Sequence, residues 1–165
     1  MAATFNWAQQ NGAPAGSATD LGASGNLFNF KTNDDATAAN YSSNPITAGN
    51  SSMEVYLRMH FTGTFNTISN LQFWMSTDFS PNTGLAVKWK GNNTTYATPS
   101  VSTNADSAVP TSDPGTANVS IGASLGGSLS AAGYSDYIRL QLQTTTSAAA
   151  GDTSLAIYTG QYDET

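Results

Sequence analysis

Apolar and polar side chains alternate strictly between residues 53 and 61. The apolar positions are Met53, Val55, Leu57, Met59 and Phe61, and the polar positions between them are Glu54, Tyr56, Arg58 and His60. A period of two places one row on each face of a β-strand. The alternation resumes in residues 71–75 and again in residues 85–89, after a turn at residues 80–84. We therefore expect three antiparallel strands between Ser52 and Trp89, with the polar face exposed to solvent.

Weaker alternation elsewhere predicts further short strands. These lie at residues 4–7 (a first strand or an arm that docks elsewhere), 26–30, 94–97, 119–121, 137–143 and 155–158. No long segment has an apolar period near 3.6, so we expect no long helix, and at most one helical turn at residues 34–39. Eight or nine short strands joined by long loops are typical of a single antiparallel β-sandwich, either jelly-roll-like or immunoglobulin-like.

The length of 165 residues suits one folded domain. Residues 8–25 are rich in Gly, Ala and Ser, so we expect residues 1–25 to form an extended N-terminal arm or loop and residues 26–165 to form the β-sandwich domain. The longest unpatterned region is Pro99–Asn118, which contains Pro110 and an Asp113-Pro114-Gly115 turn. Loops of this length are either flexible surface segments or elements used in binding and assembly.

The charge content argues against several classes of partner. Only 10% of the residues are charged and the net charge is −6. Nucleic acids and anionic membranes are bound through basic patches, so we expect neither as a partner. Cysteine is absent, which excludes disulfides and thiolate chemistry. We recognise neither a signal peptide nor a membrane span, and we expect synthesis in the cytoplasm.

The residues that enzymes use for catalysis are scarce. His60 is the single histidine, lies on the outward row of its predicted strand and has no acidic neighbour in the sequence. Glu54 and Glu164 are the only glutamates, which leaves no evident carboxylate pair for glycoside hydrolysis. Aspartates at residues 34–35, or Asp106 with Asp113, match no calcium-binding loop and suit turn caps better. We expect no enzyme activity, no cofactor and no metal.

The aromatic residues offer a binding role instead. Trp89 belongs to an inward row, whereas Trp74 breaks the parity of its strand and points outward, as do Tyr56 and Tyr137. Outward aromatic rings stack on sugars, bury against another chain or are covered by a loop of the same chain. Together with the predicted arm and the long loop, they give seven candidate interface residues: Phe5, Trp7, Tyr56, Trp74, Pro110, Asp113 and Tyr137.

Several short segments carry a resemblance to a known group of proteins. They are Phe61–Asn66, Ile68–Leu71, Phe73–Trp74, Tyr137–Leu142, Ser147–Thr153 and Tyr162–Glu164. These segments span roughly the last two-thirds of the chain and resemble small β-sandwich virion proteins of tailed bacteriophages. The resemblance implies a structural protein located in the virion, such as a head decoration (cement) protein. It carries over no catalytic residue.

That resemblance implies particular partners: the major capsid protein, further copies of this chain, or both. An uncharged polar surface with exposed aromatic rings suits extended protein interfaces. Two other interpretations remain open. The first is a carbohydrate- or receptor-binding β-sandwich module that uses Trp74 and tyrosines. The second is a hydrolase that depends on His60, which the scarcity of catalytic residues disfavours.

Overall fold

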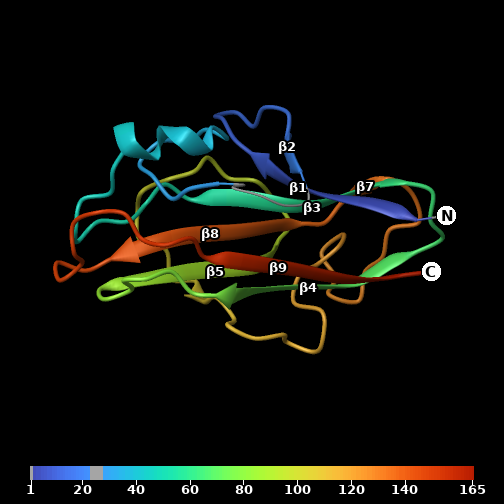
Figure 1. Ribbon diagram of the computed structural model, residues 1–165. Helices are drawn as coiled ribbons and strands as arrows, with labels where there is room; N and C mark the ends of the chain where they lie inside the picture. The colour runs from blue at the N-terminus through green and yellow to red at the C-terminus, as the bar shows by residue number, and fades with distance from the viewer. Residues whose placement is uncertain (1, 23–27) are drawn as a thin grey trace.

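The computed structural model describes residues 2–22 and 28–165, and these residues form nine β-strands and one short 3₁₀ helix, η1 (Figure 1). The strands are β1 (Ala3–Gln10), β2 (Thr19–Gly22), β3 (Val55–Gly63), β4 (Ile68–Thr77), β5 (Leu85–Asn93), β6 (Ser107–Ala108), β7 (Gly133–Tyr134), β8 (Tyr137–Thr144) and β9 (Ile157–Glu164). The helix η1 spans Ala38–Ser43, overlapping the end of the predicted helical turn. Within the described ranges, no helix is long and apolar enough to span a membrane.

The strands form two antiparallel sheets of unequal size. The large sheet has the order β2-β1-β3-β8-β5-β6, with β7 also paired to β3, and the small sheet consists of β4 and β9. Apolar side chains of the two sheets pack against each other in one core cluster. The predicted all-β class and antiparallel β-sandwich are therefore confirmed.

The predicted arrangement of the central strands is wrong. β3 and β5 both belong to the large sheet, but β8 lies between them, and β4 belongs to the opposite sheet. A single three-stranded sheet would leave the apolar face of every strand in water. Placing β4 across from β3 and β5 buries these faces against one another, which explains why the sandwich is favoured.

The inward rows of the central strands are as predicted. Leu57, Met59 and Phe61 of β3 are almost completely buried, as are Leu71 and Phe73 of β4. In β4 the pairing with β9 shifts between residues 69 and 72, and Asn70 has a φ of 52°. This β-bulge lets Ile68 and Leu71 both reach the core although they are three positions apart.

The N-terminal segment forms strands: of the two alternatives for residues 4–7, a first strand is correct and an arm is not. β1 pairs with β3 along its whole length, from Ala3 opposite Gly63 to Gln10 opposite Tyr56, and β2 extends the sheet beyond β1. Alternation in β1 brings Trp7 into the core, where it is 4% exposed. Because its apolar residues are buried between the sheets, most of this segment belongs to the sandwich.

Several other predicted strands are missing or have different bounds. Residues 28–30 and 94–97 are irregular, and residues 119–121 contribute only an isolated bridge at Ile121. Positions 26 and 27 of the predicted strand 26–30 lie outside the described residues. The last strand begins at Ile157, two residues later than predicted, and continues to Glu164.

The long Pro99–Asn118 loop covers the edges of both sheets. Its short strand β6 pairs with β5, and the Pro110 carbonyl accepts a hydrogen bond of 2.8 Å from the Met75 amide of β4. Further along, the Asn118 side chain accepts from the Phe73 amide at 2.8 Å and donates to the Phe73 carbonyl at 2.9 Å. The loop therefore pairs backbone groups at strand edges that would otherwise be open to the strands of other chains.

Candidate functional site

The seven candidate interface residues do not form one surface. Trp7 and Tyr56 are 4% and 1% exposed, so in this structure neither is available to a partner. Phe5 is half-buried and packs against Trp7, with ring centroids 5.1 Å apart. The expectation that Phe5 and Trp7 lie on a free arm is therefore corrected: both rings contribute to the core cluster.

Tyr56 and Tyr137 point to the outer face of the large sheet, as predicted, but this face is covered. Tyr96, from the segment after β5, packs on Tyr56 with ring centroids 5.0 Å apart, and Tyr137 lies 6.0 Å from Tyr56. The Arg58 guanidinium lies over the rings of both Tyr134 and Tyr137, at 4.6 Å from each centroid. Cation–π contacts and ring packing thus occupy these aromatic faces.

A buried ionic cluster anchors the long loop to this outer face. Arg139 of β8 donates two hydrogen bonds to the Asp106 carboxylate, at 2.8 and 2.7 Å, and approaches Glu54 at 3.5 Å. Burial raises the pKa of Glu54, an effect opposed by Arg139 and by the Ser100 amide. The bidentate geometry and the shielding of both acids indicate a structural role.

The aspartates considered as calcium ligands serve other purposes. Asp106 is bound to Arg139, and Asp113 accepts a hydrogen bond of 2.7 Å from the Gly115 amide, the turn cap expected from the sequence. Asp35 pairs with Lys31 at 2.6 Å. Among the described residues, no group of three or more His, Asp or Glu side chains is arranged to hold a metal ion.

His60 has an acidic partner that the sequence did not suggest. Its Nδ1 lies 2.9 Å from Oδ1 of Asp20 on β2, forty positions earlier, and its ring stacks on Tyr134 with centroids 4.0 Å apart. The pair depends on β2 joining the sheet, and β2 was not predicted. Asp20 fixes the orientation of the imidazole. The contact also links β2 to β3, which lies on the other side of β1 in the large sheet.

Trp74 and the two loop candidates lie elsewhere. Trp74 is half-buried on the outer face of the small sheet, opposite Thr159 of β9 and near the exposed Gln161. Pro110 is half-buried at the covered edge of β4, and Asp113 is exposed in its turn. Of the predicted aromatic candidates, Trp74 is the one on the outer face of the small sheet, where Gln72 is buried and Gln161 is exposed.

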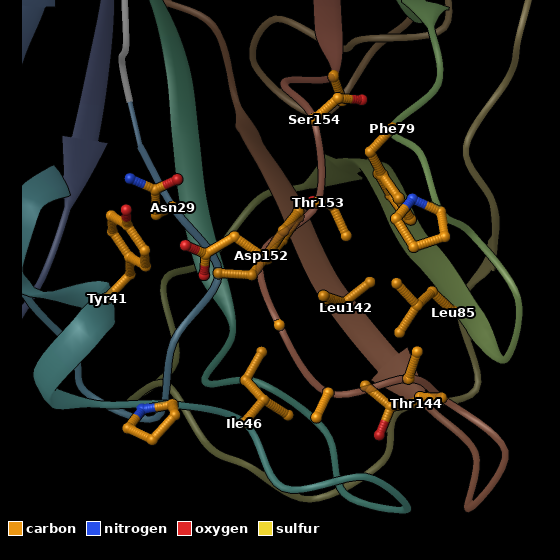
Figure 2. Close-up of a pocket in the computed structure, with 18 of the residues that line it drawn as sticks. Asn29, Tyr41, Ile46, Phe79, Leu85, Leu142, Thr144, Asp152, Thr153 and Ser154 are labelled. Atoms are coloured by element: carbon orange, nitrogen blue, oxygen red, sulfur yellow. The ribbon is translucent and has the colours of Figure 1, made fainter.

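A cavity lined by described residues lies at one end of the sandwich. Its volume is about 830 Å³. The small sheet ends at Thr77 and Ile157, whereas the large sheet continues to Leu85 and Thr144. The inward side chains of Leu85 and Leu142 consequently extend past the small sheet, and both are half-buried. Figure 2 shows these two leucines on neighbouring strands at the floor of the cavity.

Irregular segments form the other walls of the cavity. Phe28 and Phe30 line it from the segment after β2, and Phe79 lines it from the segment after β4. Residues 41–48 and 148–156 complete the walls. The chain termini lie at the opposite end of the sandwich, as Figure 1 shows.

The cavity is more apolar than polar and is almost uncharged. Asp152 is the only carboxylate among its lining residues, which include no Lys, Arg or His, and the remaining polar groups are mainly hydroxyls. Tyr158 also lines it, and its hydroxyl is buried without a hydrogen-bond partner. Burial, and to a smaller degree Asp78, raises the pKa of Tyr158. Such a lining accommodates uncharged apolar groups.

Two exposed apolar side chains line this cavity. Tyr41 and Leu155 are 39% and 67% exposed. We call the cavity and these two residues the open end. Nothing in the sequence pointed to the open end, because residues 155–158 were predicted only to form a short strand.

Comparison with known proteins identifies no relative of this chain. No family model, no curated protein and no solved structure matches it.

Proposed function

We propose that this chain is a non-enzymatic structural protein of a bacteriophage virion, of the capsid decoration type, that acts through protein–protein contacts. The observation that carries the proposal is the open end, where the exposed side chains of Tyr41 and Leu155 line a cavity with a single charged residue, Asp152. Contiguous exposed apolar surface typically marks a site of protein or membrane interaction. The net charge of −6 favours a protein partner over an anionic membrane.

The chemistry of the rest of the chain supports the same role. The pairs of Arg139 with Asp106 and of His60 with Asp20 hold a loop and a strand on the large sheet. A decoration protein needs a rigid body and a contact surface, and its many copies on one lattice make modest affinities sufficient. The partners proposed are the major capsid protein, other copies of this chain, or both.

The test is the protein content of purified phage particles. Mass spectrometry of gradient-purified virions of the encoding phage should recover peptides of this chain in many copies per particle. Purified protein added to heads that lack it should co-sediment with them. Absence from the particles, together with a failure to bind heads, contradicts the proposal.

A carbohydrate-binding function is the second candidate, and one observation favours it. Trp74 is half-buried on the outer face of the small sheet, near the uncharged polar side chains of Thr159 and Gln161. Sugars are bound by aromatic stacking next to such hydrogen-bonding groups. On a glycan array, binding that Trp74→Ala abolishes would support this candidate, and absence of binding to every glycan would remove it.

A further inference from the structure

The edges of the two sheets are protected to different degrees. The large sheet ends in short strands, β2 with four residues and β6 with two. The outer edge of β4 is covered by other segments, since Ile68 exchanges two backbone hydrogen bonds with Leu129 and the Met75 amide donates to Pro110. Within residues 2–22 and 28–165, no backbone segment pairs with the side of β9 that faces away from β4. With eight residues, β9 is the longest edge left without such cover.

The hydrogen bonds of β4 show which backbone groups of β9 face outward. In an antiparallel pair, directly opposite residues either bond to each other or both point away from each other. The amide and the carbonyl of Phe73 both bond to the Asn118 side chain, so Phe73 points away from β9. Gly160 is directly opposite Phe73. The amide and carbonyl of Gly160 therefore point away from β4, toward the uncovered side.

Two further residues of β9 share this direction. The Met75 amide bonds to Pro110, so Met75 and its opposite residue Tyr158 also point apart. Tyr162 lies two positions beyond Gly160 and has the same direction, because the period of a strand is two. The irregularities in this pair do not disturb β9, since the extra residue belongs to β4 in both. Three successive outward positions are thus arranged as the pairing of another strand requires.

Gly160 shows that solvent reaches this edge. A Cβ built on Gly160 would lie 2.8 Å from Met59 on β3 and 2.9 Å from Trp7 on β1, so its Cα faces the core. Gly160 is nevertheless partly exposed, and because glycine has no side chain, the exposed atoms are backbone atoms. β9 therefore lies across from β1 and β3 with its backbone accessible from the uncovered side.

The large sheet extends past the small sheet on the same side. Phe73 of β4 stacks on Trp89 of β5, so β4 lies toward β5 and the uncovered side of β9 lies toward β1 and β2. Phe5 of β1 and Leu21 of β2 pack against the core cluster but are only half-buried. A strand added beside β9 would lie over these two side chains. Its inward positions should therefore be apolar.

The charge of the small sheet indicates which strand would bind. β4 and β9 contain no Lys, Arg or His, whereas β9 carries Asp163 and Glu164. Asp163 is exposed, and alternation places its side chain on the outer face of the sheet. β9 thus has neither the Lys nor the Pro with which edge strands commonly prevent pairing. A cationic strand complements this edge, whereas a second copy of the chain, with its net charge of −6, does not.

We propose that the uncovered edge of β9 binds an extended segment of another protein as an added β-strand, and that apolar residues alternate with Lys or Arg in this segment. Its apolar side chains cover Phe5 and Leu21, and its cationic side chains lie on the outer face beside Asp163. Backbone pairing supplies the affinity and the alternate side chains supply the specificity. The inference goes beyond the proposed function, because it concerns a surface other than the open end and requires no virion.

The test is amide hydrogen exchange, followed by NMR, in the presence of a capped peptide in which valine alternates with lysine. The peptide has the length of β9, eight residues. The amides of Tyr158, Gly160 and Tyr162 should exchange at least about tenfold more slowly with about 1 mM peptide than without it. The amides of Thr159 and Gln161 point toward β4 and should exchange slowly in both states. No slowing, or slowing only outside β9, overturns the inference.

Two control peptides test the pattern and the charge. One has the same composition but carries its valines and lysines in separate blocks, and the other has glutamate in place of lysine. Each should bind at least about tenfold more weakly than the alternating lysine peptide. Equal binding of all three peptides overturns the inference.

A pair of protein variants tests the position of the charge. Asp163→Lys should weaken binding of the lysine peptide at least about fivefold at low salt and should strengthen binding of the glutamate peptide. Asp113→Lys makes the same change of charge in an exposed turn outside the small sheet and should leave both affinities within about twofold. Equal effects of the two variants contradict a site at β9. Failure of these experiments leaves the proposed function standing, since the content of phage particles tests that function separately.

Discussion

The two ends of this sandwich are built from strands with the same alternation, yet only one end is filled. At the end that holds the termini, the rings of Phe5, Phe61 and Tyr162 fill the space between the sheets, with centroids 4.8 to 5.9 Å apart. At the open end, Leu85 and Leu142 of the large sheet extend past the small sheet and face a cavity.

Backbone contacts reinforce the difference. At the filled end, which we call the closed end, the Ala3 amide donates to the Glu164 carboxylate at 2.8 Å, and the Thr165 carbonyl accepts from Asn66 and Thr67 at 2.8 and 3.0 Å. Ile68 also exchanges two backbone hydrogen bonds with Leu129 there. The closed end therefore contributes to stability, whereas the open end leaves apolar surface for a partner.

The largest expected effect comes from truncating one inward side chain at each end. Phe61→Ala should destabilise the fold by about 3–5 kcal/mol, because Phe61 is fully buried among other rings. Leu142→Ala should cost only about 1–2 kcal/mol, because half-buried Leu142 loses fewer contacts. Urea unfolding at a protein concentration that keeps the chain monomeric measures both. Equal losses would show that the two ends are packed equally well.

Enlarging a side chain at each end tests the same contrast from the other direction. Ile68→Phe adds volume to a fully buried position at the closed end and should cost about 1–3 kcal/mol. Leu142→Phe directs the added volume into the cavity and should be neutral or stabilising by up to about 1 kcal/mol. A large loss for Leu142→Phe in the same unfolding assay would mean that the cavity is not available in solution.

A smaller effect should follow from removing the Tyr158 hydroxyl. Tyr158→Phe eliminates a buried group without a partner and should stabilise the fold by about 1 kcal/mol. Tyr162→Phe is the matched control on the same strand: it keeps the ring that contacts Phe61, and it should change stability by less than about 0.5 kcal/mol. A loss of stability in Tyr158→Phe would reveal a hydrogen bond absent from this structure.

The same variant should alter the response to alkaline pH. Burial raises the pKa of Tyr158 in the folded state above its ordinary value of 10.0, so the folded state retains a proton that the unfolded state releases. The resulting stabilisation is complete below about pH 10 and decreases as the pH rises towards the folded-state pKa. Tyr158→Phe should reduce this alkaline loss in urea unfolding. Burial also raises the pKa of Tyr96, so part of the alkaline loss of stability should remain in this variant.

The local pattern of the sequence predicted which residues face inward but not which strands are neighbours. The rows of β3, β4 and β8 follow directly from a period of two. The pairing of β4 with β9 does not, because residues some ninety positions apart carry no joint signal in one sequence. The bulge at Asn70 and the cover of Tyr56 by Tyr96 are likewise tertiary features.

The candidate site was less predictable for the same reason. The open end exists because β4 and β9 end before β5 and β8 do, and this offset depends on how the two sheets are stacked. Five of the seven candidates were large aromatic residues, and the two most buried of them have structural roles. Trp7 packs in the core, and Tyr56 is covered by Tyr96 on the outer face of the large sheet. Leu155 was not predicted as an exposed residue because it belonged to the predicted strand 155–158.

The most direct test of this account is amide hydrogen exchange measured with and without phage heads that lack this protein. We predict that protection of residues 148–156 increases when the heads are added, while residues 61–68 at the closed end stay unchanged. Unchanged protection at the open end, or increased protection at the closed end, would contradict the claim that the open end is the binding surface.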